Sequence, residues 1–330
     1  MIVTLTPNPS VDRTVSLAGP LQRGQVQRAV TTTTDPGGKG INVARAVTAA
    51  GRIAVAVLPG EPDDPLVLAL RDAQVTHRAV PVPGRIRTNL TVAEPDGTTT
   101  KINEPGAPLD GSVRAALREA LLREAAGARW AALCGSLPPG VPADWYVELV
   151  VGLRQRGCSV AVDTSGAPLT ALVARGPAAL PDLLKPNAEE LAEVTGADPL
   201  ALEADPRRAA DAARVLLGGG PGAVLVTLGA AGALLVTAAG TWRATSAPVV
   251  ARSTVGAGDS TLAGYLLADL AGADPPERLR TAVAYGAAAV ALPGSAMPEP
   301  HHVAPRLVTV APLQPHPTPR PAESDAHAGR

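Results

Sequence analysis

The sequence predicts an α/β fold with a central, mostly parallel sheet, helices on both of its faces and a small additional β-sheet. Short apolar, β-branched runs alternate with helix-like runs along most of the chain, which is typical of β-α-β units. Two segments break this alternation, and they account for the additional sheet. The strand-like runs are 2–6, 53–58, 76–82, 129–134, 158–163 and 223–228. The helix-like runs are 41–50, 65–73, 111–126, 142–156 and 207–217.

Bulk composition indicates a cytoplasmic protein. The 330 residues are 46% hydrophobic, which suits one large domain or a domain with a smaller appendage. The formal net charge of -1 gives no electrostatic basis for binding nucleic acid. No run has the roughly 18 consecutive apolar residues of a membrane span, and MIVTLTPNPS at the start resembles a strand rather than a signal peptide. We expect Cys134 and Cys158 to be reduced thiols.

The two interrupting segments predict a lid. Residues 11–34 are polar and end rich in threonine, and residues 86–104 contain the alternating runs IRTNLTVA and TTTKIN. The EPDG sequence (94–97) between these runs is typical of a turn. We expect a small antiparallel sheet outside the main layer, and the alternative is two ordinary surface hairpins. The tail, residues 311–330, is rich in Pro, His and small polar residues, so we expect it to be disordered.

A glycine-rich turn, TVGAGD (254–259), leads into an apolar, helix-periodic run. Gly256 and Gly258 allow the backbone to approach a ligand closely, and the first amides of the following helix suit an anion such as a phosphate. Asp259 at this junction has two interpretations. It is either a favourable residue for capping the helix, or a general base that accepts the proton of an attacking hydroxyl beside the phosphate. The spacing alone favours neither.

Three further stretches have features of a phosphate or nucleotide site. GGKG (37–40) precedes a helix and adds a cation to a second glycine-rich turn. KPNAEE (185–190) opens another helix, where Glu190 either holds Mg²⁺ through water or stabilises the helix dipole. TLGAAG (227–232) ends a strand and either cradles a nucleotide or links two strands. Lysine occurs only at positions 39, 101 and 185, and two of these lie in the stretches above.

In combination and in this order, GGKGINVAR (37–45), KPNAEE and STVGAGDSTLAG (253–264) resemble the motifs of the PfkB, or ribokinase-like, carbohydrate kinase family. The resemblance covers residues 1–310, which would form one kinase domain with its lid at 11–34 and 86–104. TPNPSVDRTV (6–15), TTTKINEPG (98–106) and CGSLPPGV (134–141) are similar to the branch that phosphorylates fructose 1-phosphate. Ser253 fits that branch, whereas Asp is usual elsewhere in the family. Cys134 and Thr227 depart from the family pattern at positions where the change removes no required function.

This resemblance implies phosphorylation of the C6 hydroxyl of fructose 1-phosphate by ATP with Mg²⁺. Asp259 would accept the hydroxyl proton, and the amides of Gly256, Ala257 and Gly258 would stabilise the transferred phosphoryl group. ATP and Mg²⁺ are assigned to Lys185, Asn187, Thr227, Gly229, Gly232, Thr254 and Glu190, the last as the metal residue. The sugar phosphate is assigned to Asp12, Gly38, Lys39, Asn42, Arg87, Lys101 and Ser136, with Arg87 on the substrate's own phosphate. The resemblance also implies a homodimer that pairs through the lids.

Three alternatives remain open to the sequence. Tagatose 6-phosphate or fructose 6-phosphate would undergo the same chemistry, although Lys39 inside the glycine-rich loop argues against the fructose 6-phosphate kinases. A non-catalytic sugar-phosphate sensor is disfavoured because base, anion hole and metal motif are all intact. A dinucleotide-dependent dehydrogenase would need a glycine-rich fingerprint after the first strand, where TPNPSVD stands instead.

Overall fold

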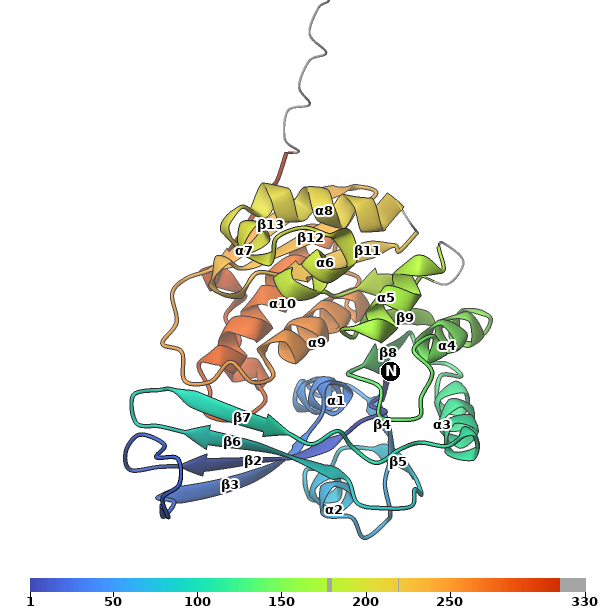
Figure 1. The fold of residues 1–330 in the computed structure, drawn as a ribbon. Helices are drawn as coiled ribbons and strands as arrows, with labels where there is room; N and C mark the ends of the chain where they lie inside the picture. Colours follow the sequence, from blue (N-terminus) through green and yellow to red (C-terminus); the bar gives the residue numbers. More distant parts are fainter. Residues whose placement is uncertain (177–179, 219, 315–330) are drawn as a thin grey trace, which may run out of the picture.

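The computed structural model describes residues 1–176, 180–218 and 220–314, and its centre is a ten-stranded sheet (Figure 1). The seven strands from one edge are parallel, and the last three are antiparallel. From the parallel edge the order is β5 (His77–Val80), β4 (Ala54–Pro59), β1 (Ile2–Leu5), β8 (Trp130–Cys134), β9 (Ser159–Asp163), β10 (Leu183–Leu184), β11 (Ala223–Thr227), β12 (Ala233–Thr237), β13 (Gly240–Ser246) and β14 (Val308–Pro312).

Helices cover both faces of this sheet and bury a separate hydrophobic core on each. In β1, Val3 and Leu5 face one core and Ile2 faces the other. One face carries α1 (Lys39–Ala49), α2 (Pro65–Asp72), α9 (Ala257–Leu270) and α10 (Pro275–Val290). The other carries α3 (Gly111–Glu124), α4 (Trp145–Arg154), α5 (Ala167–Ala174), α6 (Ala188–Thr195), α7 (Pro199–Ala204) and α8 (Pro206–Gly218). Burial on both sides explains why the central strands are continuous apolar runs.

A second, four-stranded sheet projects to one side of the main layer (Figure 1). Its order is β3 (Thr31–Gly37), β2 (Ser10–Ser16), β6 (Arg87–Ala93) and β7 (Thr99–Asn103). Two antiparallel hairpins are joined by a parallel pairing of β2 with β6, so the expectation of a purely antiparallel sheet is wrong. β2 and β6 each follow a parallel strand of the main sheet, β1 and β5, and therefore leave it in the same direction.

The structure has every strand and helix that the alternation predicts, with bounds that differ by a few residues. The sequence patterns did not indicate α5, α7, α10 or the three antiparallel strands β12 to β14. The last strand also runs through Pro312, so the first two residues of the predicted tail pair with β13. Residues 315–330 of that tail lie outside the described residues. Within the described part of the chain, none of the helices has the length and apolar character needed to cross a membrane.

Candidate active site

Charged side chains meet at the carboxyl ends of the parallel strands, where ligands bind in this class of sheet. Asp163 is the last residue of β9, and Lys185 directly follows β10. The first turns of α1, α6 and α9 bring Lys39, Glu190 and Asp259 to the same region, as the contacts described below show.

The turn before α9 has the backbone that its glycines predict. Gly256 is the N-cap with φ 75°, in the left-handed region that favours glycine. A Cβ at Gly258 would lie 3.5 Å from the Lys185 Nζ, so a lysine ammonium lies next to this turn. The Ala257 amide makes a long hydrogen bond of 3.4 Å to the carbonyl of Thr254, whose side chain is exposed. Helix amides and an adjacent cation together suit an anion such as a phosphate.

Asp259, in the first turn of α9, is 7% exposed. Its Oδ2 accepts a hydrogen bond of 2.9 Å from Asn42 Nδ2 on α1. Burial and the negative charge of Asp163 raise the pKa of Asp259 to about 6, against the opposing effects of Asn42 and two lysines. Gly256, not Asp259, is the N-cap of α9, and among the described residues no side chain makes a capping hydrogen bond there. A buried carboxylate with a raised pKa beside an anion-binding turn suits a general base.

Asp163, which the sequence analysis did not single out, joins two of the chain's three lysines. Its Oδ1 lies 2.6 Å from Lys39 Nζ, and its Oδ2 lies 3.0 Å from Lys185 Nζ. Burial lowers the pKa of Lys39, but the carboxylates of Asp163 and Glu190 outweigh burial and raise it above the ordinary value. Burial would raise the pKa of Asp163, but the two ammonium groups lower it overall. Lys39 and Asp163 are therefore both charged at neutral pH.

Asn187 and Glu190 form a capping box at the start of α6. Asn187 Oδ1 accepts from the Glu190 amide at 2.8 Å, and Glu190 Oε2 accepts from the Asn187 amide at 2.9 Å. Glu190 Oε1 lies 3.5 Å from Lys39 Nζ and is not used by the cap. Among the described residues, no cluster of three or more His, Cys, Asp or Glu could enclose a metal ion. One carboxylate oxygen outside the capping box fits Mg²⁺, which binds few protein carboxylates, keeps several waters and binds substrate phosphates.

The TLGAAG stretch lies beside α6, although it also links β11 to β12. The Thr227 amide donates to the Pro186 carbonyl over 3.1 Å, and Thr227 pairs with Asn187 in an isolated bridge. Gly229–Ala231 forms a 3-10 turn, and a Cβ at Gly232 would overlap the Ala244 carbonyl oxygen. The predicted nucleotide residues of two separate stretches are thus adjacent.

Several of the predicted sugar-phosphate residues lie where the second sheet joins the main layer. Asp12 Oδ1 accepts from Ser10 Oγ at 2.7 Å and from Asn89 Nδ2 at 3.0 Å. Gly38 caps α1 with φ 116°, and a Cβ there would lie 2.7 Å from Thr6 Cγ2. The glycines of GGKG therefore let the start of α1 pack tightly against the chain that follows β1.

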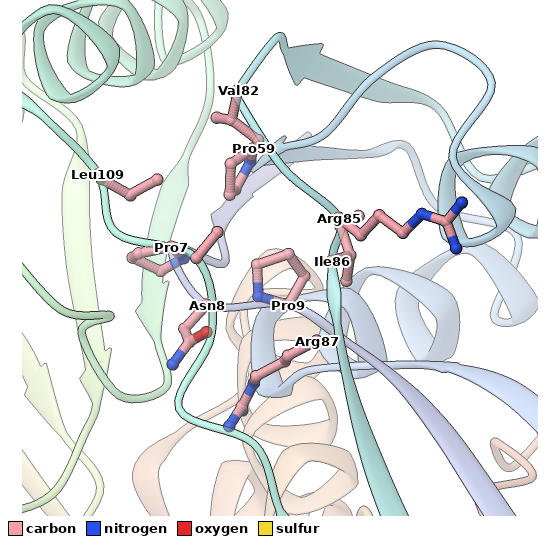
Figure 2. Close-up of a pocket in the computed structure, with 10 residues that line it drawn as sticks. Pro7, Asn8, Pro9, Pro59, Val82, Arg85, Ile86, Arg87 and Leu109 are labelled. Carbon is pink, nitrogen blue, oxygen red and sulfur yellow. The ribbon is translucent and has the colours of Figure 1, made fainter.

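Arg87 lines a pocket together with Asn8. In Figure 2 the amide nitrogen of Asn8 and the guanidinium of Arg87 both point towards the lower left of the view. Arg87 Nη1 donates to the Glu104 carbonyl at 2.9 Å, whereas its buried Nε has no hydrogen-bond partner within the described residues. Burial lowers the pKa of Arg87, against the carboxylates of Asp12 and Glu104. A guanidinium with an unused buried donor fits an anionic ligand.

Two predicted residues remain, and among the described residues only one of them contacts another residue of the site. Ser136 is exposed and accepts a hydrogen bond of 3.3 Å from Asn8 Nδ2. Lys101 is exposed on the edge strand β7, opposite Thr91, and none of the ion pairs between described residues joins it to the other site residues. Their roles stay predictions.

The sequence analysis missed three residues that organise the site. Asp163 is the last residue of the apolar strand β9, and the sequence analysis assigned it to that strand without giving it a role. Asn8 is buried, and its Nδ2 also donates to the Pro105 carbonyl at 3.1 Å, which ties the segment after β7 to the segment after β1. Arg45 Nη1 donates to the carbonyls of Pro36 and Ser295, at 3.2 and 3.3 Å. The only available signal was a polar residue inside a motif, TPNP for Asn8 and GGKGINVAR for Arg45.

Known proteins with similar sequences identify the family. A family model described as pfkB family carbohydrate kinase matches residues 6–302. This chain belongs to the pfkB family of carbohydrate kinases. It is 38% identical to a protein of Rhodobacter capsulatus named 1-phosphofructokinase, over 95% of this chain and 98% of that protein. It is 35% identical to the ATP-dependent 6-phosphofructokinase isozyme 2 of Escherichia coli, over 87% and 92% of the two chains.

Solved structures confirm the ribokinase-like fold of this family member. Phosphofructokinase-2 from Escherichia coli, solved with substrates and products, has a TM-score of 0.83 at 32% identity and covers 91% of this chain and 96% of its own. Ribokinase from Arabidopsis thaliana has a TM-score of 0.71 at 21% identity, over 90% and 95% of the two chains, and supports the fold alone. The chain is therefore an enzyme, a sugar kinase, and kinases of this family use ATP with Mg²⁺.

Proposed function

We propose that this kinase transfers the γ-phosphoryl group of ATP to the C6 hydroxyl of fructose 1-phosphate, giving fructose 1,6-bisphosphate and ADP. The observation that carries the proposal is the buried Asp259 carboxylate beside the Gly256–Gly258 turn and the two lysines held by Asp163. The choice of sugar is supported by the relatives in Rhodobacter capsulatus and Xanthomonas campestris, 38% and 36% identical, that are named 1-phosphofructokinase.

In this proposal Asp259 accepts the proton of the C6 hydroxyl while the hydroxyl oxygen attacks the phosphoryl group in line. The bond to the ADP oxygen breaks, and its electron pair leaves with ADP. The amides of Gly256, Ala257 and Gly258 face the charge that develops on the phosphoryl oxygens. Asn42 holds the Asp259 carboxylate in place through its 2.9 Å hydrogen bond. Lys39 and Lys185 compensate negative charge beside the turn.

ATP and Mg²⁺ are proposed to bind along the starts of α6 and α9. Lys185, Asn187 and Thr254 would contact the phosphates, and Thr227, Gly229 and Gly232 would line the rest of the nucleotide site. Glu190 would hold Mg²⁺ through water with Oε1, the oxygen that the capping box does not use. When bound, the metal ion neutralises charge on the transferring phosphates. The sugar would bind to Asp12, Gly38, Lys39 and Asn42, with its 1-phosphate on Arg87 and with Ser136 and Lys101 as weaker contacts.

The proposal is tested by following fructose 1-phosphate with ATP and Mg²⁺ by ³¹P NMR. We expect a second phosphomonoester signal at C6 of the sugar and one equivalent of ADP. Release of inorganic phosphate without a new sugar signal would contradict the proposed acceptor. No consumption of ATP with any sugar phosphate would instead favour the sensor.

A second candidate is a kinase of 6-phosphorylated ketoses, because a 35% identical relative is named ATP-dependent 6-phosphofructokinase isozyme 2. Fructose 6-phosphate and tagatose 6-phosphate carry their phosphate at the opposite end of the sugar. They would need the same base and anion hole, but a different anchor from Arg87. Substrate preference separates the two candidates.

We also propose that the chain forms a homodimer through the second sheet, which acts as a lid. The sheet leaves apolar side chains exposed, with Val30 at 64% and Ile102 at 58% exposure, near its outer strands β3 and β7. Closure of a lid would exclude water from the phosphoryl group in transit.

A further inference from the structure

Asp163 has no role in the chemistry proposed above, yet both site lysines converge on it. Its side chain is 1% exposed at the end of β9, and each oxygen has its own ammonium partner, at 2.6 Å for Lys39 and 3.0 Å for Lys185. Lys39 comes from the glycine-rich start of α1, and Lys185 comes from the end of β10. One buried carboxylate thus joins the sugar-binding loop to the nucleotide-binding loop.

The two ammonium groups would not stay together without an anion between them. Lysine is a point charge on a flexible four-carbon stem, and two such charges repel one another. The surroundings of the pair differ: Lys185 is buried beside Gly258, whereas the side chain of Lys39 is 34% exposed and also reaches Glu190 at 3.5 Å. Asp163 therefore fixes one lysine at the anion-binding turn and restrains the more accessible one next to it.

We propose that Asp163 is a positioning residue that holds Lys39 and Lys185 side by side at the phosphate site before any substrate binds. This inference rests on the proposed function, because it presumes that both lysines act on phosphates. Fixing a flexible side chain in one conformation costs entropy. When the two lysines are ordered before substrate binds, this cost is not part of the activation barrier. Asp163 acts only through the lysines and touches no reacting atom.

A purely structural role does not explain this arrangement. A buried ion pair is on average no more stabilising than well-packed apolar side chains. Asp163 also brings a second negative charge to the site of the Asp259 carboxylate, which raises the pKa of that residue. A carboxylate that only stabilised the fold would avoid this repulsion if it lay away from Asp259, as Asp269 does at the far end of α9.

Asp269 provides a matched control. Its side chain is 2% exposed, and it holds two cations, Arg278 at 2.9 Å and Arg129 at 3.4 Å, and Trp130 Nε1 at 2.7 Å. It lies ten residues after Asp259 on the same helix, roughly 15 Å along the axis. Asp163→Asn and Asp269→Asn thus make the same chemical change in two buried clusters, of which only one adjoins the proposed site.

Kinetics and thermal unfolding of both variants form the first test. We expect Asp163→Asn to lower kcat about 100-fold, because a misplaced group in an active site costs this much. Asp269→Asn should lower the melting temperature and leave kcat within about twofold, since distant sites act independently. Asp163→Asn with the kcat of the wild type would overturn the proposal. Should that variant not fold, Asp163→Glu retains the charge but displaces it, and wild-type kcat in Asp163→Glu would equally overturn it.

The second test measures the NMR signals of the lysine side chains and needs no kinase activity. The chain has only three lysines, so each signal can be followed separately. In protein labelled with ¹³C-lysine, each Cε–Hε signal is assigned by its Lys→Arg variant. We expect Asp163→Asn to shift the signals of Lys39 and Lys185 and to leave that of exposed Lys101 in place. Unshifted Lys39 and Lys185 signals would contradict the positioning role. If Asp163→Asn shifts both signals but the wild-type protein phosphorylates no sugar phosphate, the proposed function is refuted and the placement of the two lysines by Asp163 stands.

Discussion

At the scale of single residues, burial raises the pKa of Asp259 to about 6, so the carboxyl is a stronger base than usual and is still ionised at neutral pH. If it is the general base, Asp259→Asn removes the proton acceptor and keeps the shape of the side chain. We expect kcat to fall at least 100-fold, about the contribution of a positioned base, with an unchanged circular dichroism spectrum. The helix-capping interpretation predicts the opposite, a folding defect with near-normal turnover in the molecules that fold.

The pKa of Asp259 sets the pH dependence of the reaction. Because the base must be deprotonated and its pKa is raised to about 6, kcat/KM should fall as the pH drops through about 6. The groups that determine this pKa besides burial are Asp163, Asn42, Lys39 and Lys185. In Asp163→Asn the acid limb should move to lower pH, because a negative neighbour is lost. A flat profile between pH 5 and 7 in the wild type, at about one unit either side of this pKa, would argue against the assignment.

The same pKa predicts that the Asp259 carboxylate destabilises the fold. The folded state binds a proton on Asp259 more tightly than the unfolded state, where the pKa is near 3.8. Stability therefore declines as the pH rises from 3.8 to about 6, and the loss is complete above that range. We expect Asp259→Asn to raise the free energy of unfolding at pH 7 by on the order of 3 kcal/mol. Urea titrations at pH 7 and pH 4 should show this gain only at pH 7; a loss at pH 7 would support the capping role.

At the scale of elements, α9 positions Asp259 only if it packs closely on α10. Gly264 on α9 has no room for a side chain, because a Cβ there would lie 2.8 Å from the Thr281 carbonyl oxygen and 3.0 Å from the Ala282 Cα. Gly264→Ala should therefore destabilise the protein by about 1–3 kcal/mol through overpacking. Gly218→Ala is the control, because no atom of the described residues outside its chain neighbours and its own helix lies within 4 Å of its Cβ position at the end of α8. Equal urea midpoints for the two variants would contradict this account of the helix pair.

The sequence predicted the parallel half of the main sheet and pointed to much of the candidate site, because both depend on local patterns. The alternation of apolar, β-branched runs with helix-like runs identified β1, β4 and β8, and motif resemblance pointed to Asp259, Lys39 and Lys185. It did not indicate β12 and β13, although these strands form a hairpin between neighbouring segments. It also did not indicate β14 or the parallel pairing of β2 with β6, since these depend on contacts between distant segments. Asp163 was missed for the same reason: an acidic residue ending a buried strand has no local signature until two lysines meet it.

At the scale of the whole molecule, the second sheet is a projecting element with exposed apolar side chains, which suits an interface. We expect Ile102→Asp, which places a charge on the edge strand β7, to convert a dimer to a monomer in light-scattering chromatography. Leu200→Asp is the control, because Leu200 is 73% exposed on α7, away from the second sheet. A wild-type monomer, or a dimer that both variants leave intact, would rule out pairing through this strand.

The central claim is that this site phosphorylates fructose 1-phosphate with Asp259 as the base. Its most direct test compares kcat/KM for fructose 1-phosphate, fructose 6-phosphate and tagatose 6-phosphate, with ATP and Mg²⁺, in the wild type and in Asp259→Asn. We predict a preference of several orders of magnitude for fructose 1-phosphate, and loss of turnover with every sugar in the variant. Preference for a 6-phosphate, or near-normal turnover in Asp259→Asn, would contradict it.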